Sequence, residues 1–132
     1  MAKAFRVKIV TLSKTVVDED VEKLFTKTQF GEIEFLPGYA PSILSTVPCI
    51  TKICDENGNM RELFTSKGVI NIKNNELIFC CDAAEYPEEI DFQRAEKAKE
   101  RAQKRISEKE KYDVTRAEAA LQRAIVRLSL KK

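Results

Sequence analysis

The organisation of this chain is decided at the stretch Ala84-Glu85-Tyr86-Pro87-Glu88-Glu89-Ile90-Asp91. All four glycines and all four cysteines of the 132 residues lie before Pro87, and residues 87–132 contain no glycine and only that one proline. Residues 1–86 carry 10 basic and 12 acidic side chains, whereas residues 87–132 carry 13 and 9. The sequence therefore predicts two domains, 1–86 and 87–132, that fold by different rules.

Short strands separated by turns are expected before Pro87. Within Phe5–Ile9 apolar and basic residues alternate, which is the period-two pattern of a strand with one buried face. Other β-type runs predict strands at Val21–Thr26, Ile50–Cys54, Arg61–Thr65, Val69–Ile72 and Leu77–Cys81. Many short strands at regular spacing indicate a β-sandwich or a β-barrel. The stretch Leu36–Pro41 contains two prolines and a glycine, so we expect an ordered loop there.

Two helices are expected after Pro87, because apolar residues recur there at spacings of three and four. They are Ala95, Ala98, Ala102 and Ile106, then Val114, Ala117, Leu121, Ala124 and Leu128. The segment Ser107–Asp113 is polar enough to turn, although nothing in it forbids one continuous helix. An antiparallel hairpin is the simplest arrangement. For the start of the second helix, a capping box of Thr115 and Glu118 competes with an N-cap at Asp113.

The apolar stripe of both helices is mostly alanine. Alanine removes little area from water, and at about 25 cal/mol per Å² such a seam holds a closed hairpin weakly. A hairpin that opens is therefore one interpretation. A hairpin permanently packed on the first domain is the other, and periodicity alone favours it.

Composition excludes several classes of function. The chain has no histidine, so it lacks the usual general base near neutral pH. The cysteines Cys49, Cys54, Cys80 and Cys81 show no C-x-x-C spacing and are expected to be buried free thiols. No glycine-rich phosphate loop is present. The acidic residues Asp18–Glu22 lack calcium-loop spacing, so they predict a solvated loop and no metal site. No catalytic constellation is found.

Targeting signals are also absent from the sequence. The first ten residues alternate charged and apolar side chains, unlike a signal peptide, and no apolar run approaches the roughly 18 residues of a membrane span. These features predict a soluble cytosolic protein with reduced cysteines. A formal net charge of +2 gives no global field that would attract nucleic acid or an acidic membrane.

Arginines follow a regular spacing on both predicted helices. Arg94 and Arg101 are seven residues apart, as are Arg116 and Arg123, and Arg127 lies one turn after Arg123. In a closed hairpin these guanidinium groups can converge on phosphate oxygens. The alternative is that they pair with Glu96, Glu100 and Glu118 on a solvated face, and the residues alone favour that alternative.

One stretch makes a family recognisable. The string Gly31-Glu32-Ile33-Glu34-Phe35-Leu36-Pro37-Gly38-Tyr39-Ala40-Pro41 resembles the G-E-L-G-I-L-P-G-H-A-P loop of the epsilon subunits of rotary (F-type) ATP synthases. Residues 65–69, 82–85 and 116–124 agree with the same family in order and spacing. The resemblance covers almost the whole chain. Glu34, Tyr39 and Lys67 depart from the Gly, His and Gly that are common in the family.

The resemblance implies an α+β protein, with an N-terminal ten-stranded β-sandwich followed by a C-terminal antiparallel two-helix hairpin. It implies a non-catalytic rotor subunit that binds the gamma subunit and the c-ring, with Glu32 facing the c-ring, at the cytoplasmic face of a bacterial cell membrane. The helices would inhibit ATP hydrolysis when they extend into the alpha/beta catalytic hexamer, and permit it when folded.

Some bacterial members of that family bind ATP at the hairpin through an I-D-x-x-R-A motif. Residues 90–95 match this motif in full, and the accompanying positions fall on other charged residues. The resemblance therefore implies ATP as a regulatory ligand, with no required cofactor or metal, at Glu85, Ile90, Asp91, Arg94, Ala95, Arg101, Arg123 and Arg127.

Two other functions are compatible with parts of the sequence. The first is an ATP-sensing epsilon subunit whose helices inhibit weakly or not at all. The second is a basic helical arm that binds nucleic acid, motivated by the net charge of +4 in residues 87–132. The nine acidic residues interspersed in that segment argue against the second function, so no nucleic-acid partner is expected.

Overall fold

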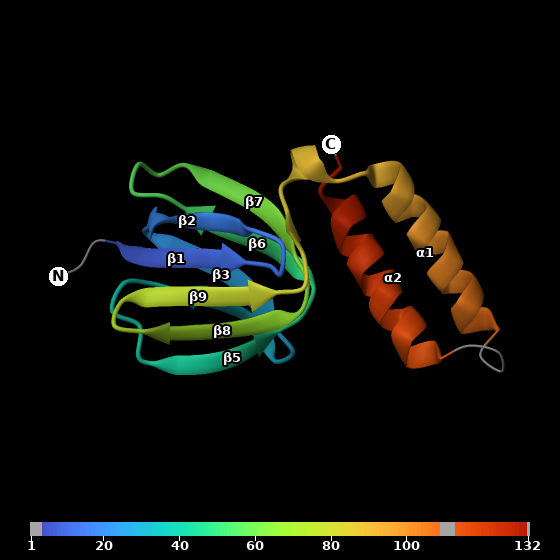
Figure 1. The fold of residues 1–132 in the computed structure, drawn as a ribbon, viewed down its shortest axis with the longest axis horizontal. Coiled ribbons are helices and arrows are strands. Elements are labelled where there is room, and N and C mark those ends of the chain that lie inside the picture. Colours follow the sequence, from blue (N-terminus) through green and yellow to red (C-terminus); the bar gives the residue numbers. More distant parts are fainter. Residues whose placement is uncertain (1–3, 109–112, 132) are drawn as a thin grey trace. The chain divides into compact units, whose positions relative to one another are not determined.

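A computed structural model describes residues 4–108 and 113–131 of the chain, which separates into two compact units, Met1–Tyr86 and Pro87–Lys132. Figure 1 shows strands in the first unit and helices in the second. The predicted β-sandwich followed by an antiparallel helical hairpin is confirmed. The described elements are β1 (Phe5–Val10), β2 (Thr15–Val21), β3 (Lys23–Thr28), β4 (Gly31–Phe35), β5 (Ser42–Thr46), β6 (Cys49–Cys54), β7 (Met60–Thr65), β8 (Gly68–Lys73), β9 (Glu76–Cys81), β10 (Ala84–Glu85), the 3-10 helix η1 (Pro87–Glu89), α1 (Phe92–Ser107) and α2 (Val114–Ser129).

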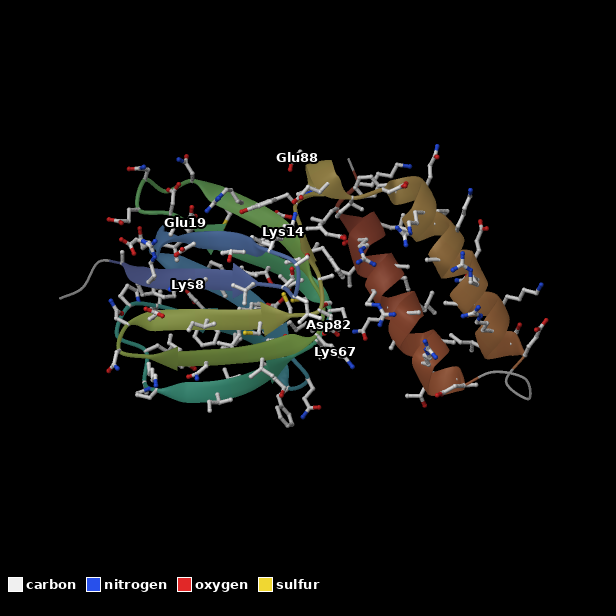
Figure 2. All side chains as sticks on the ribbon, viewed as in Figure 1. Lys8, Lys14, Glu19, Lys67, Asp82 and Glu88 are labelled. Atoms are coloured by element: carbon white, nitrogen blue, oxygen red, sulfur yellow. The ribbon has the colours of Figure 1, made fainter. Side chains whose placement is uncertain are left out.

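The ten described strands form two five-stranded sheets, which selects a sandwich over a barrel. One sheet has the order β2-β1-β9-β8-β5 and the other has the order β10-β7-β6-β3-β4. Neighbouring strands are antiparallel except β1 and β9, which run parallel with Arg6 opposite Glu76. The turns that carry Lys14, Lys67 and Asp82 lie at one end of this unit (Figure 2).

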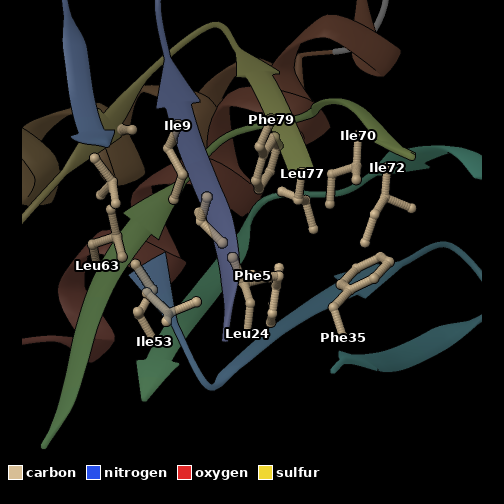
Figure 3. Packing of buried hydrophobic residues seen from close by; sticks show 14 of the residues in the cluster. Phe5, Ile9, Leu24, Phe35, Ile53, Leu63, Ile70, Ile72, Leu77 and Phe79 are labelled. Atoms are coloured by element: carbon tan, nitrogen blue, oxygen red, sulfur yellow. The ribbon is translucent and has the colours of Figure 1, made fainter. Parts of the chain in front are cut away.

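The core of the sandwich is built from the inward-facing residue of each alternating pair. Phe5, Val7 and Ile9 are at most 1% exposed, as the alternation in the first strand predicts. Phe35 and Phe79 contribute large side chains from the two different sheets (Figure 3). Both sheets thus bury one face against the other, and this holds the unit together.

One end of this core is polar. Thr26, Thr51 and Thr65 are at most 3% exposed and lie on neighbouring strands. The Thr51 hydroxyl is 3.0 Å from that of Thr26 and 2.7 Å from that of Thr65, and the Cys49 thiol is 3.2 Å from the Thr26 hydroxyl. The buried hydroxyls therefore satisfy one another, which removes most of the cost of burying them.

The predicted strand Val21–Thr26 is wrong as a single element. The structure has two strands there, because β2 ends at Val21 in one sheet and β3 begins at Lys23 in the other. The chain crosses between the sheets at Glu22, whose N–H donates to the carbonyl of Cys54. Apolar residues on both sides of Glu22 make the sequence resemble one continuous strand, so the sequence alone does not indicate the change of sheet.

The acidic stretch is also not the predicted loop. Asp18, Glu19 and Asp20 lie in the edge strand β2. Arg6 on the neighbouring strand donates to Asp18 at 2.9 Å and to Asp20 at 3.3 Å. Opposite charges across two strands stabilise the pairing that the loop prediction overlooked. Within residues 4–108 and 113–131, no group of three or more side chains could hold a metal ion.

The cysteines follow the predicted burial only in part. Cys49 and Cys81 are buried, but Cys80 is exposed and Cys54 is half-buried. The alternation of β9 explains this difference, because adjacent residues of a strand point to opposite faces. Burial raises the pKa of the Cys81 thiol to about 12, so this thiol stays protonated at neutral pH.

The expected loop Leu36–Pro41 connects β4 to β5. It is hydrogen-bonded to the turn between β8 and β9, which is distant in the sequence. The Gly38 N–H donates to Asn75 Oδ1 at 2.9 Å, and Asn75 Nδ2 donates to the Ala4 carbonyl at 2.8 Å. Asn75 itself has a φ of 62°, which asparagine tolerates better than most residues. The turn between β8 and β9 thus positions the loop that carries the family resemblance.

Gly68, where β8 begins beside β9, provides a test of the sheet packing. A Cβ added at this position would lie 2.2 Å from the Cys80 carbonyl oxygen. The Gly68→Ala variant is therefore expected to lose about 1–3 kcal/mol of unfolding free energy, as overpacked sites do. Urea denaturation measures the loss. The control Ser45→Ala, at an exposed position of β5, is expected to stay within about 0.5 kcal/mol; equal stabilities of the two variants would contradict the packing described here.

Candidate functional site on the helical unit

Both helices begin at an aspartate that caps them. Asp91 Oδ1 accepts a hydrogen bond from the Arg94 N–H at 3.0 Å, and Asp113 Oδ1 accepts one from the Arg116 N–H at 3.2 Å. Each carboxylate satisfies one of the free N–H groups of a helix start and also complements the helix dipole. Asp113, and not the alternative capping box, therefore starts α2.

The seam between the helices consists of small residues. Ala95 and Ala102 of α1 and Ala117 and Ala124 of α2 are each at most 5% exposed. The helices run antiparallel side by side (Figure 1), and the seven-residue spacing places each pair of alanines on one face of its helix. The predicted alanine seam is confirmed, and with it the small apolar area that holds the hairpin closed.

Four arginines have a fixed relation to this seam. Arg94, Arg101, Arg116 and Arg123 each directly precede one of the four buried alanines. One residue corresponds to a rotation of about 100°, so each arginine flanks the seam. Two antiparallel helices are related by a two-fold axis perpendicular to the plane that contains both helix axes. Residues that directly precede a buried alanine on either helix therefore lie on the same side of the pair.

Two further arginines share that side. Arg105 lies three residues after Ala102 and Arg127 three residues after Ala124, which brings both back to the same flank. Arg94, Arg101, Arg105 and Arg116 are exposed, and Arg123 and Arg127 are half-buried. We call this set of six side chains the arginine face; side-chain nitrogens lie along both helices in Figure 2.

The glutamates proposed as partners in the alternative interpretation lie elsewhere. Glu96 and Glu118 directly follow buried alanines, so they flank the seam on the opposite side of the pair. Glu100 precedes Ala102 by two residues and points away from the seam. The geometry therefore disfavours neutralisation of the arginine face by these three acids. Six guanidinium groups on one side suit a ligand with several phosphate oxygens.

The other residues of the expected ATP site have separate structural roles. Ile90 is 8% exposed and its N–H donates to the Pro87 carbonyl, Asp91 caps α1, and Ala95 belongs to the seam. A carboxylate has about four lone-pair sites, so capping leaves Asp91 able to accept a further donor. Glu85 belongs to the other unit, in β10 opposite Phe64.

Arg105 and Arg116 are members of the arginine face that the resemblance did not include. For Arg116, the seven-residue distance from Arg123 is the sequence signal that indicates the shared face. Arg116 is also the residue whose N–H is bound by the Asp113 cap, so it lies at the start of α2.

The sandwich unit carries the position expected to meet a ring of partner subunits. Glu32 lies in the edge strand β4, opposite Lys27 of β3, and is exposed. Phe30, in the turn between β3 and β4, is 91% exposed. The Phe30 N–H donates to the Thr28 hydroxyl at 3.1 Å, and that hydroxyl donates to the Gly31 carbonyl, so the turn has a defined shape. In the described part of the chain, neither helix has the length and apolar character needed to cross a membrane.

Comparison with known proteins gives the same two-part division. Residues 4–87 match the family model of the ATP synthase delta/epsilon chain β-sandwich domain, and residues 88–132 match that of its long α-helix domain. An ATP synthase epsilon chain of Clostridium botulinum is 45% identical over 132 residues, which is 100% of this chain and 98% of that protein. One of Clostridium perfringens is 43% identical over 105 residues, or 80% and 79% of the two chains.

A solved structure has the same fold. A chain in the mitochondrial ATP synthase assembly of Euglena gracilis, which comprises OSCP, F1 and the c-ring, superposes with a TM-score of 0.83 at 20% sequence identity. The match covers 95% of this chain and 79% of that chain.

Proposed function

Because this chain belongs to the ATP synthase delta/epsilon chain family, we propose that it is a central-stalk rotor subunit that couples ion translocation to ATP synthesis. The observation that carries this proposal is similarity over both domains to proteins named ATP synthase epsilon chain. The protein is not itself an enzyme. Its partners are the gamma subunit and the c-ring, at the cytoplasmic face of a bacterial cell membrane.

The sandwich serves as the coupling domain in this proposal. Its two sheets bury a continuous core, so the unit can transmit torque without deforming. The exposed Glu32 on the edge strand β4 is the proposed contact with the c-ring. The loop Leu36–Pro41, held by Asn75, follows the other end of β4 and gives that end a defined surface for a partner.

The helical unit serves as the regulatory domain. In the folded hairpin it permits ATP hydrolysis, and extended along gamma into the alpha/beta hexamer it inhibits hydrolysis. The alanine seam supports such a change, because little apolar area is lost when the two helices separate. Positive charges on one side of the hairpin repel one another and further weaken the closed state.

ATP reverses that balance. Its phosphates attract guanidinium groups from both helices, so ATP binds the closed hairpin more tightly than the open one and shifts the population toward it. Arg94, Arg101, Arg123 and Arg127 hold the phosphates in this proposal, and Asp91 accepts a hydrogen bond from adenine or ribose. Ile90 and Ala95 fix the start of α1 and its approach to α2.

A second candidate function keeps the ATP site but not the inhibition of ATP hydrolysis by the helices. The arginine face by itself supports an ATP-sensing subunit whose helices inhibit hydrolysis weakly or not at all. The two candidates differ only in what the complex does when residues 87–132 are removed, which is a measurable difference.

Association with gamma tests the coupling role. We expect the full-length chain and the fragment 1–86 to co-purify with the gamma subunit of the same organism in equal amounts, because the sandwich provides the interface. Size-exclusion chromatography of the mixtures measures the association, with the fragment 87–132 as the matched control. Failure of the full-length chain to bind gamma would contradict the proposed function.

A further inference from the structure

The segment through which the chain leaves the sandwich is held weakly at its end. This exit segment, Ala83–Tyr86, follows β9 and precedes Pro87. It contains the edge strand β10, which has two residues, with Ala84 opposite Thr65 and Glu85 opposite Phe64. Such a short edge strand adds little pairing energy by itself, so its flanking contacts decide whether it stays in place.

An inner contact and an outer contact flank β10. At the inner end, the Ala83 N–H donates to the Ser66 hydroxyl at 2.8 Å and the Ser66 N–H donates to the Ala83 carbonyl at 2.9 Å. At the outer end, Arg61 Nη1 donates to the Tyr86 hydroxyl at 3.3 Å. The Tyr86 ring also packs against the edge of the core.

Arg61 is itself oriented by the opposite sheet. Its guanidinium pairs with Glu19 of β2, so the contact spans the open side of the sandwich from one sheet to the other. Glu19 lies on β2 in Figure 2. Glu19 Oε1 and Arg61 Nε are shielded from water, although both side chains are more than a third exposed overall. A cross-sheet ion pair therefore orients the donor of the outer contact.

The two contacts differ in strength. The inner one uses backbone groups and the hydroxyl of Ser66, a residue that is only 1% exposed. The outer one uses long side chains that must lose rotamer freedom to meet. The outer contact is thus expected to open first, which frees Ala84, Glu85 and Tyr86 and adds about 10 Å to the connection between the units.

We propose that Glu19, Arg61 and Tyr86 form a latch that sets the length of free chain between the sandwich and the helical unit. When the latch is closed, the free connection begins at Pro87. When it opens, the connection begins at Ala83. The consequence for regulation rests on the proposed function, because a longer connection extends the reach of helices that act at a distance from the sandwich.

Hydrogen exchange of the full-length chain tests the latch. Tyr86→Phe removes the hydroxyl but keeps the ring, and Arg61→Met removes the donor and the charge. Both variants are expected to raise the exchange rate of the peptide 83–87 by about 2- to 12-fold, the equivalent of one lost hydrogen bond. Peptides from β1 and β9 are expected to keep the exchange rates of the parent chain.

The matched control is Arg6→Met, which removes another arginine that pairs with carboxylates of β2. It is expected to leave the exchange of peptide 83–87 unchanged. Unchanged exchange of that peptide in both latch variants would overturn the proposal. Equal acceleration throughout the sandwich would also overturn it, because the two residues would then be general stabilisers. This readout needs neither gamma nor ATP, so it is independent of whether the proposed function holds.

Discussion

Replacing Arg94 or Arg123 by alanine is expected to lower the affinity of the full-length chain for ATP by about 10- to 150-fold. Each guanidinium is proposed to donate to a phosphate oxygen, and a hydrogen bond to a charged group contributes about 1.5–3 kcal/mol. The two residues lie on different helices but on the same side of the alanine seam. Isothermal titration calorimetry of the parent and both variants measures the loss.

Lys97→Ala is the matched control for these variants. Lys97 lies two residues after the buried Ala95, so it carries a positive charge on α1 but points away from the seam. Its substitution is expected to change ATP affinity less than about twofold, as a distant surface charge does. A parent chain that binds no ATP at millimolar concentration, or equal losses in all three variants, would show that the arginine face is not a phosphate site.

Deletion of residues 87–132 is expected to raise ATP hydrolysis by the assembled complex by about 5- to 150-fold, the range of typical allosteric couplings. The physical reason is that the deletion removes the segment that is proposed to reach the catalytic hexamer and leaves the proposed coupling domain in place. Steady-state hydrolysis of complexes assembled with the full-length chain or with residues 1–86 measures the effect.

Assembly must be shown to be equal in both complexes, and gamma content measured by gel densitometry serves for this. The control substitution Ser45→Ala on the sandwich is expected to leave hydrolysis unchanged. A different outcome is that the deletion leaves hydrolysis unchanged while ATP still binds the full-length chain. In that case the second candidate function, an ATP-sensing subunit that does not inhibit hydrolysis, replaces the first.

Four strands in the middle of the sheets could be predicted because burial of their side chains follows a regular pattern along the sequence. β1 and β9 lie side by side inside one sheet, and β6 and β7 inside the other. Each has an inward residue that must be apolar, so period-two patterns or continuous apolar runs mark them in the sequence. Predictions for these four strands agree with the structure.

Edge strands and the crossing between sheets were not predictable in the same way. β2 and β4 each pair on one side only, and their outward residues are acidic, so local composition resembles a loop. β2 is held in the sheet by its pairing with β1 and by the buried Val17 and Val21, and its acids pair with Arg6, twelve residues before Asp18. A pairing partner so distant in the sequence leaves no local signal, which also explains why the change of sheet at Glu22 was missed.

On the helical unit, the sequence indicated that arginines repeat every seven residues but not which side of the pair they share. That side depends on where the buried alanines lie and on the antiparallel direction of the helices. The motif at residues 90–95 likewise showed its residue types but not their separate tasks. The structure assigns capping to Asp91 and the seam to Ala95, while ATP binding stays a prediction.

The central claim is that ATP holds the two helices together, and interhelical contacts of the seam alanines measure this most directly. In a chain with 13C-methyl alanine, the account predicts that saturating ATP strengthens the nuclear Overhauser contacts between Ala95 or Ala102 of α1 and Ala117 or Ala124 of α2. The Arg123→Ala variant is predicted to show no such gain. Contacts of equal intensity with and without bound ATP would contradict the account, because binding would then leave the helices as they were.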